Sequence, residues 1–480
     1  MPDLPVSYLF MVRATNIMRS RRLAGLTLAA SLAAAGLTAS TAGTAAATPT
    51  PCSSGQVTRQ TLPDGATYLI QCPKSTWNGT LYLYSHGYVE PGAPNPAQDV
   101  GDPATGAYML GHGYALAGSS YSTTGWAIAD ALPDQIATLN AFDSLYGPPA
   151  TTVAWGHSLG GIITAGLIQD FPSRFNAALP MCGVLSGGVA TWNTALDAAF
   201  AFQKLIAPSV QIVNITDPPA NLASAEAAAA QAQQTPQGRA RLALVAALAD
   251  TPGWFFPTSP EPAANDYVSQ EANQFLWASE VTFPFAFAFR AELEARAGGN
   301  PSWNTGVNYF TDLAKSADFR EVAALYQQAG LSLSVDVTRL DASRRIAADP
   351  NAEAYLVKNV VFNGDISVPV LSMHTTGDGL VVPENEQAYR SAVDRAGHGN
   401  LLRQVFVHRA GHCTFTPAET IAAVQTLENR LATGQWNGLS PATMNAEAAA
   451  LGPLNVAPPA FISFSPARYL RPFDLAPSFP

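Results

Sequence analysis

The stretch VAWGHSLGGIITAG, residues 153–166, constrains the fold of this chain more than any other. An apolar run leads into Gly156, Ser158 and Gly160, and a second apolar run follows them. Glycines two residues before and after a serine permit a turn so tight that side chains there would collide with neighbouring backbone. The spacing therefore predicts a strand that ends at Ser158 and a helix that begins directly after it, with the hydroxyl exposed between them. The alternative is an ordinary turn, which serine and glycine also favour.

Strand-like and helix-like segments alternate on both sides of this turn. Before the middle of the chain, strands are expected at 79–87, 114–122, 151–158 and 175–183. Helical spacing separates them at 134–147, and the same alternation resumes from 367. Alternating buried strands and helices favour an α/β fold, with a parallel sheet covered by helices on both faces.

Between about residues 189 and 360 the pattern changes, because Ala-rich helical segments follow one another without a strand signal. This change inside a sheet-forming sequence predicts an inserted helical subdomain. The insertion carries aromatic clusters, among them 254–256 and the stretch FPFAFAF at 283–289, whose period of two favours a short extended segment. Core packing is the first expected role of these rings. The alternative is a lid that lines an apolar pocket above Ser158.

The N-terminal 47 residues have the features of a secretory signal peptide. A basic MRSRR is followed by an apolar stretch and by small residues with an A-x-A site near Ala45–Ala47. We therefore expect a secreted protein, exported by either the general or the twin-arginine route. The expected parts of the chain are the signal segment (1–47), the first part of the core (48–188), the helical insertion (189–360), the second part of the core (361–435) and a C-terminal tail packed on the surface (436–480).

Charge and hydropathy exclude several classes of partner. The net charge is −10 and no basic cluster lies in the body of the chain, whereas phosphate binding needs a Lys/Arg surface. No nucleic acid partner is therefore expected. No segment after the signal peptide is long and apolar enough to span a bilayer, so no stable membrane anchor is expected either. His, Cys and carboxylate residues show no metal-ligand spacing, which predicts neither a metal nor a cofactor.

A serine hydroxyl needs a base, and the base needs an orienting acid, to act as a nucleophile at neutral pH. His412, in the stretch VHRAGHCTFTPAE, is the expected base because it follows a glycine between the last strand and the last helix. Asp378, in TTGDGLVVP, is the expected acid because it follows a strand end. His408 lies inside a strand-like run, which favours a buried structural histidine. The competing acids are Asp365, which precedes the strand, and Glu384.

These motifs resemble those of the α/β-hydrolase superfamily, and its esterase and lipase members in particular. The matching residues are His86-Gly87, the Gly156–Gly160 turn, Gly377-Asp378 and Gly411-His412. The resemblance covers roughly residues 60–188 and 365–435, and it implies an α/β-hydrolase fold with a mostly parallel sheet and a large helical cap. It also implies an oxyanion hole formed by the backbone N–H groups of Tyr88 and Leu159.

Four cysteines fit an oxidising compartment. Cys52 and Cys72 flank a hairpin-like LPDGATY and are expected to form a disulfide. Cys182 and Cys413 lie far apart in the sequence, and they are either buried free thiols or a second pair. The implied fold would let Cys182 tether the loop of the expected base from a neighbouring strand end. In tannases and fungal-type feruloyl esterases the pairing cysteine precedes the serine, where this chain has His157.

The resemblance implies a secreted serine esterase. Ser158 would attack the carbonyl of a small-molecule or polymeric ester, His412 would take its proton, and Asp378 would orient the imidazole. The first alternative is a peptidase or amidase of the same fold, with acidic cap residues that bind a substrate amino group. The candidates for that role are Glu271, Glu280, Glu292 and Glu294. A non-catalytic binding protein on a hydrolase scaffold is the second alternative.

Overall fold

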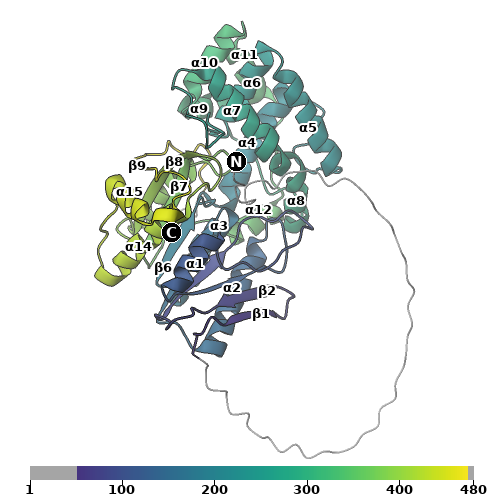
Figure 1. The fold of residues 1–480 in the computed structure, drawn as a ribbon. Helices are drawn as coiled ribbons and strands as arrows, with labels where there is room; N and C mark the ends of the chain where they lie inside the picture. Colours follow the sequence, from purple (N-terminus) through teal and green to yellow (C-terminus); the bar gives the residue numbers. More distant parts are fainter. Residues whose placement is uncertain (1–50, 474–480) are drawn as a thin grey trace, which may run out of the picture. The chain divides into compact units, whose positions relative to one another are not determined.

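The computed structural model describes residues 51–473, so the expected signal segment, residues 1–47, lies outside the described residues (Figure 1). Its central element is a nine-stranded sheet with the order β1-β2-β4-β3-β5-β6-β7-β8-β9. The strands are β1 (Val57–Thr61), β2 (Thr67–Gln71), β3 (Thr80–Ser85), β4 (Ala115–Ser119), β5 (Thr151–His157), β6 (Ala177–Met181), β7 (Val370–Gly377), β8 (Leu402–Ala410) and β9 (Phe461–Ile462).

Six neighbouring strands of the sheet pair in parallel, in the order β4, β3, β5, β6, β7 and β8. Strands β1, β2 and β9 pair antiparallel at the two edges. Parallel neighbours need long crossovers, which the helices of the core provide. The core helices are α1 (Pro103–Gly111), α2 (Ile128–Tyr146), α3 (Leu159–Asp170), α13 (Glu384–Arg395), α14 (Pro417–Thr433) and α15 (Pro441–Ala450). This mostly parallel sheet with its helices confirms the predicted α/β architecture.

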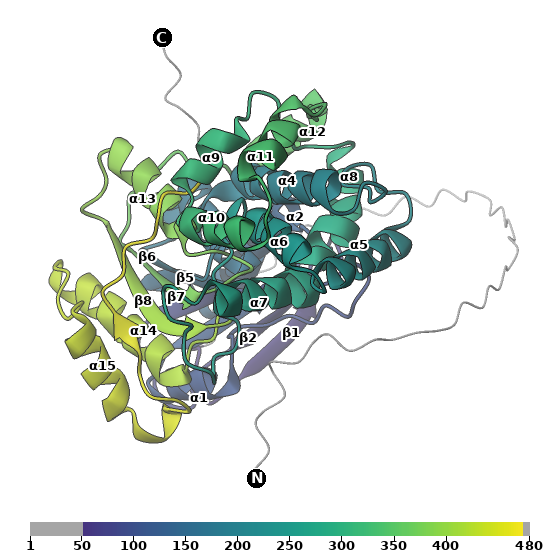
Figure 2. The same ribbon diagram turned by 90° about the horizontal axis from the view of Figure 1, so that it is seen from above.

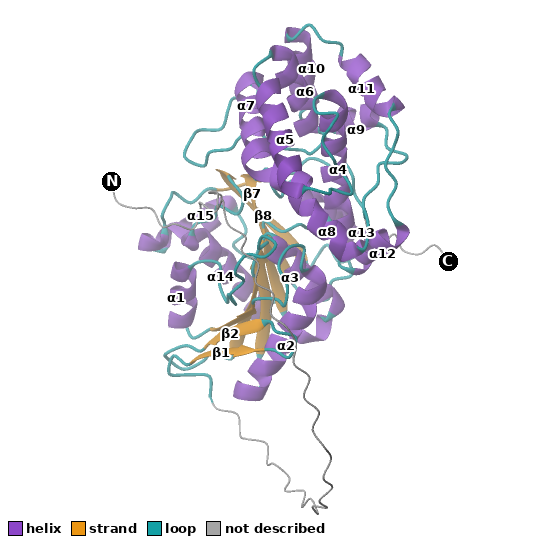
Figure 3. Cartoon of the chain, turned by 90° about the vertical axis from the view of Figure 1, so that its right-hand side faces the viewer, coloured by secondary structure: helices purple, strands orange, loops and turns teal. Residues whose placement is uncertain are grey.

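Helices cover both faces of the sheet (Figure 3). Because side chains alternate along a strand, Leu81 and Leu83 of β3 face one hydrophobic core and Tyr82 and Tyr84 face the other. The first core lies under α2, α3 and α13, and the second lies under α1 and α14. Strands buried on both faces explain the nearly continuous apolar runs in the sequence.

Helices α4 to α12 occupy the chain between β6 and β7, and we call them the helical insertion. They are α4 (Gly187–Leu205), α5 (Pro218–Ala232), α6 (Pro236–Ala247), α7 (Tyr267–Trp277), α8 (Arg290–Ala297), α9 (Tyr309–Lys315), α10 (Phe319–Gln328), α11 (Leu333–Ala342) and α12 (Pro350–Lys358). Most of them pack around their own hydrophobic core, which includes Phe200, Phe202, Leu244 and Tyr326. Seen from above, they group together, apart from α14 and α15 (Figure 2). Within residues 51–473, no helix is both long enough and apolar enough to cross a bilayer.

The stretch FPFAFAF at 283–289 is helical, so the expectation of an extended segment is wrong. π-Helical turns before and within it connect α7 to α8. Phe283 and Phe287 are four residues apart and therefore share one helix face, where both pack against Phe202 of α4. The four phenylalanines at every second position thus form two pairs on different faces of a helix. The same spacing in the sequence is also typical of a short strand, which would place all four on one face.

The C-terminal segment does more than cover the surface. Helix α15 packs beside α14, and β9 extends the sheet by pairing with β8. Farther along, Tyr469 is buried and its backbone N–H donates to Gln387 of α13. Arg471 forms an ion pair with Asp197 of α4. The segment therefore connects the core of the sheet to the helical insertion.

Candidate active site

The turn between β5 and α3 places Ser158 at the carboxyl end of the sheet. Its backbone has φ 58° and ψ −122°, a conformation that costs energy for any residue other than glycine. A Cβ atom at Gly156 would lie 2.4 Å from the carbonyl oxygen of Ser85, and one at Gly160 would lie 1.9 Å from the same oxygen. The end of β3 therefore presses directly on the turn, and only glycine fits at these positions. The predicted strand, turn and helix are confirmed.

The structure brings Asp378 and His412 together from two neighbouring loops. Asp378 follows β7 and is completely buried, while His412 lies between β8 and α14. Asp378 Oδ1 accepts hydrogen bonds from the backbone N–H groups of Leu380 and Val381, both at 3.0 Å. Its other oxygen, Oδ2, lies 2.7 Å from His412 Nδ1. This arrangement leaves Nε2 as the imidazole nitrogen that is free to accept a proton from a nucleophile.

Two rigid neighbours hold the loop that carries His412. After the loop, Thr416 and Glu419 form a capping box that fixes the first turn of α14. Arg409, at the end of β8, donates to both carboxylate oxygens of the same Glu419, at 2.6 and 3.0 Å. Before the loop, Gly411 donates its N–H to the carbonyl oxygen of Gly377, at 3.0 Å. The imidazole is therefore carried by a short segment whose two ends are held by hydrogen bonds to neighbouring residues.

The structure contains both disulfides, Cys52–Cys72 and Cys182–Cys413. The second connects the end of β6 to the residue directly after His412, and Cys413 Sγ lies 3.4 Å from His412 Nε2. The donor atoms of Cys182, Cys413 and His412 lie within 4.8 Å of one another, a spacing that would suit a metal ion if the thiols were free. Because the two sulfur atoms are bonded to each other, they cannot act as thiolate ligands.

Removal of the Cys182–Cys413 disulfide is expected to lower both stability and catalysis. A Cys182→Ala/Cys413→Ala variant should lose about 2–5 kcal/mol of unfolding free energy, because the bond closes a long loop. It should also lose about tenfold in kcat, because the imidazole is less well positioned. The Cys52→Ala/Cys72→Ala variant is the matched control, since that bond closes the β1–β2 hairpin. Urea unfolding and steady-state kinetics should show lower stability in both variants and lower kcat in the first alone. Equal losses of kcat would contradict this role.

The residues expected to form the oxyanion hole lie on either side of Ser158. A Cβ atom at Gly87 would come within 3.4 Å of the Ser158 Cβ, so the loop after β3 passes directly against the serine. His86 is buried and its ring nitrogens lie near two backbone carbonyl oxygens, which fixes the loop. Leu159 is the first residue of α3, where backbone N–H groups have no partner within the helix. Tyr88 and Leu159 both line the cavity described below.

The side chains of the other candidate residues contact other groups or face solvent. His157 Nδ1 lies 3.1 Å from the Tyr84 hydroxyl, and burial, together with the charge of His412, lowers the pKa of His157 to about 4. His408 is 41% exposed on β8 and lies 3.5 Å from Glu261, so the expectation of a buried histidine is wrong. His408 lies on the second strand from the edge of the sheet, and its ring contacts Trp254, with centroids 5.0 Å apart. Asp365 lies on the surface.

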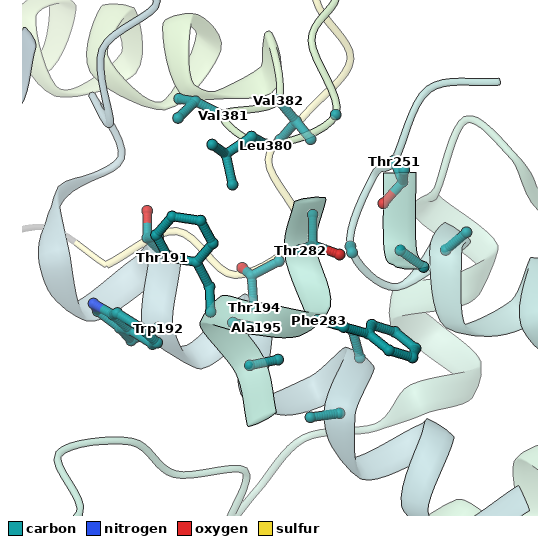
Figure 4. A pocket seen from close by; sticks show the side chains of 18 of the residues that line it. Thr191, Trp192, Thr194, Ala195, Thr251, Thr282, Phe283, Leu380, Val381 and Val382 are labelled. Atoms are coloured by element: carbon teal, nitrogen blue, oxygen red, sulfur yellow. The ribbon is translucent and has the colours of Figure 1, made fainter. Parts of the chain in front are cut away.

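An apolar cavity opens beside Ser158, with an empty volume of about 1300 Å³ including its mouth. Its walls come from α4, α6, the segment 278–287 and the loop after β7. Leu380, Val381 and Val382 of this loop lie opposite Thr194 and Ala195 of α4 (Figure 4). Among the described residues that line the cavity, none carries a charge. The cavity therefore suits an uncharged and mainly apolar group.

Aromatic residues of the helical insertion reach the mouth of this cavity. The ring of Tyr88 contacts Phe285 and Phe289, with centroids 5.0 and 5.7 Å apart. Phe285 lines the cavity, as do Phe283 and Phe287 on the other face of the same helix. Phe283 and Phe287 thus pack in the core of the insertion, as first expected, and they also line the cavity.

The acidic residues considered for binding a substrate amino group are occupied elsewhere. Glu271 accepts a hydrogen bond from Gln233, Glu292 pairs with Arg296 at 2.6 Å, and Glu294 pairs with Arg290 at 3.1 Å. Glu280 is exposed, and none of the four lines the cavity. Three of the four thus have partners elsewhere, and none of the four lies on the wall of the cavity beside Ser158.

Comparison with known proteins gives one clear relative, and no family model matches the chain. An o-phthalyl amidase from Xanthobacter agilis is 29% identical over 422 residues, which span 81% of this chain and 90% of the relative. Similar solved structures include feruloyl esterase B from Aspergillus oryzae, with 12% identity, coverage of 80% and 81%, and a TM-score of 0.37. The rice cell wall degrading esterase LipA from Xanthomonas oryzae has 12% identity, coverage of 78% and 87%, and a TM-score of 0.33. The strand order, with β3 between β4 and β5, and the turn at Ser158 show that this chain has the α/β-hydrolase fold.

Proposed function

We propose that this chain is a secreted serine hydrolase that cleaves apolar carboxylic esters. One observation carries the proposal. His412 is hydrogen-bonded to the buried Asp378, and Ser158 occupies a strained turn on the wall of an apolar cavity. Strain of this kind is retained where the rest of the fold imposes it, and such positions cluster at active sites. The two disulfides support export to an oxidising compartment.

In the proposed reaction, His412 accepts the hydroxyl proton of Ser158 as the serine oxygen attacks the ester carbonyl. Asp378 keeps the proton of His412 on Nδ1 and stabilises the imidazolium that forms. The N–H groups of Tyr88 and Leu159 bind the negative oxygen of the tetrahedral intermediate, and each such donor contributes about 3 kcal/mol. His412 then protonates the departing alcohol. Water, activated by the same imidazole, hydrolyses the acyl-enzyme and restores Ser158.

The substrate class follows from the cavity. Because its lining is uncharged, it favours a neutral acyl or alcohol group over one that carries an amino group. An aminopeptidase is therefore disfavoured. An amidase with an apolar acyl group is the second candidate, and it is supported by the relative that cleaves an o-phthalyl amide. Esters and amides use the same residues, so rates on matched substrates decide between them.

The test compares one acyl group in two linkages. The mature protein is incubated with p-nitrophenyl benzoate and with benzoyl p-nitroanilide, and a fluorophosphonate probe is used to label the nucleophile. Faster cleavage of the ester, with the probe mapped to Ser158 by mass spectrometry, is the expected result. Faster cleavage of the anilide would replace the esterase by an amidase. Hydrolysis of neither substrate, with no labelling of Ser158, would favour the non-catalytic scaffold.

The length of the acyl chain should depend on α4. Its residues Thr191, Ala195, Ala198 and Phe202 line the cavity and span twelve positions, or roughly 16 Å of helix. An Ala198→Leu substitution should lower the ratio of kcat/KM for p-nitrophenyl palmitate over butyrate about tenfold, because it fills space that a long chain needs. The exposed Ala227→Leu on α5 is the control and should leave this ratio unchanged. An unchanged ratio in both variants would place the acyl chain elsewhere.

A further inference from the structure

A buried histidine lies behind the aspartate of the proposed triad. His374 belongs to β7 and is fully buried, and Asp378 follows it by four residues, directly after the end of the strand. Its Nδ1 lies 3.1 Å from Glu386 Oε1 on α13, and its Nε2 lies 2.7 Å from the carbonyl oxygen of Val381. The same Nε2 lies 3.7 Å from Asp378 Oδ2, the oxygen that binds His412.

The partners of His374 determine its protonation. The carbonyl oxygen of Val381 can only accept, so Nε2 must carry a hydrogen. Glu386 Oε2 accepts from the hydroxyl of Ser372 and from the amide of Gln404, both at 2.5 Å. A carboxylate can only accept a hydrogen bond, so Nδ1 faces Glu386 with a hydrogen. Both ring nitrogens of His374 therefore carry hydrogens, and the ring is an imidazolium.

Comparison with a second buried histidine, His86, shows that the neighbouring carboxylates are what raises the pKa of His374. His86 is buried to a similar degree, but both of its ring nitrogens lie near neutral carbonyl oxygens, and burial lowers its pKa. Burial also opposes charge on His374. The hydrogen bond and charge of Glu386, followed by the charge of Asp378, outweigh this effect, and the pKa of His374 is raised.

We propose that His374 is a positioning residue of the active site: an imidazolium, balanced by Glu386, that holds Asp378 as a correctly oriented anion. This inference rests on the proposed function. Because His374 and His412 approach the same carboxylate oxygen, the positive charge of His374 also opposes protonation of His412. A variant that lacks this positive charge is therefore expected to need a higher pH for activity.

Other titratable groups surround this pair. Glu384 begins α13 and is buried, and burial, with a contribution from the charge of Asp318, raises its pKa to about 7. Burial raises the pKa of Asp318 to about 6. Burial also raises the pKa of Asp250 strongly, and the charge of Glu384 raises it further. His157 faces His412 from β5 and stays neutral, as described above. Near neutral pH Glu384 is therefore partly protonated, and Glu386 is the counter-ion in direct contact with His374.

The test is the pH dependence of kcat/KM for p-nitrophenyl butyrate in His374→Gln and Glu386→Gln. Both variants remove the positive charge behind Asp378, the second because His374 loses its counter-ion and becomes neutral. The acidic limb of the profile should move to higher pH by about one unit, so that activity on that limb falls about tenfold. Tyr389→Phe is the matched control, because it removes a buried hydroxyl from the same helix, and its profile should match that of the unmodified protein.

A purely structural role gives a different result. His374→Gln and Glu386→Gln would then lose the same fraction of kcat/KM at every pH, with the acidic limb unmoved, and this outcome would overturn the proposal. Should neither variant fold, nitrogen-15 NMR of the imidazole rings of the unmodified protein decides. The proposal requires one histidine with both nitrogens protonated from acidic to neutral pH, and its absence overturns the inference. Failure of the proposed function is distinct, since it appears as hydrolysis that does not depend on Ser158.

Discussion

Replacement of Ser158 by alanine is expected to lower kcat for ester hydrolysis about a million-fold, because no acyl-enzyme can form without the hydroxyl. A small residual rate over that in water should remain, since the proposed oxyanion donors and the cavity are unchanged. Single-turnover and steady-state hydrolysis of p-nitrophenyl butyrate measure the loss. Loss of fluorophosphonate labelling in the same variant gives an independent readout.

The control for this variant is Ser144→Ala, which removes an exposed hydroxyl from α2. It should retain full activity and full labelling. Ser158→Ala should also be at least as stable as the unmodified protein, because alanine keeps the Cβ atom in the same turn. A Ser158→Ala protein with more than a tenth of the original kcat would show that another group is the nucleophile.

The second large effect is expected for Asp378→Asn, which should lower kcat about ten-thousand-fold. The structure gives a specific reason. The N–H groups of Leu380 and Val381 both point at Oδ1, so the amide oxygen of an asparagine must take this position. Its NH2 group must then face His412 Nδ1, which has to accept a hydrogen bond. The imidazole proton is forced onto Nε2, and no basic nitrogen remains for Ser158.

Circular dichroism and thermal unfolding separate this effect from a loss of the fold. An Asp378→Asn protein that is folded but holds the wrong tautomer should show native circular dichroism and a thermal transition, yet negligible activity near neutral pH. Asp365→Asn, on the surface, is the control and should have normal kinetics. A loss of less than tenfold would mean that a different acid, such as Glu384, orients His412.

The parts of the site that the sequence predicts are those fixed by short-range geometry. Gly156 and Gly160 reveal the turn, because any turn this tight between a strand and a helix excludes a Cβ atom. Asp378 and His412 are predictable for a related reason. Each follows a strand of a parallel sheet, and the carboxyl ends of neighbouring parallel strands lie at one edge.

What the sequence does not predict depends on contacts between distant segments. Glu386 meets His374 only because α13 packs against β7, and nothing near either residue reveals that pairing. The two-residue β9 forms because β8 offers it an edge, and its own sequence has no strand pattern. The cavity wall on α4 is a similar case, since small residues at helical spacing occur on many Ala-rich helices that line nothing.

The connection made by Tyr469 and Arg471 has a consequence for biosynthesis. These residues bind both α13 and α4, yet the ribosome adds them after the whole insertion and the whole sheet. During translation, the sheet and the helical insertion can form their separate cores, and the ion pair between Arg296 and Asp130 can already link them, before this last connection is made. The connection through residues 469 and 471 therefore forms only near the end of synthesis, and a chain that is shortened before residue 469 should lack it.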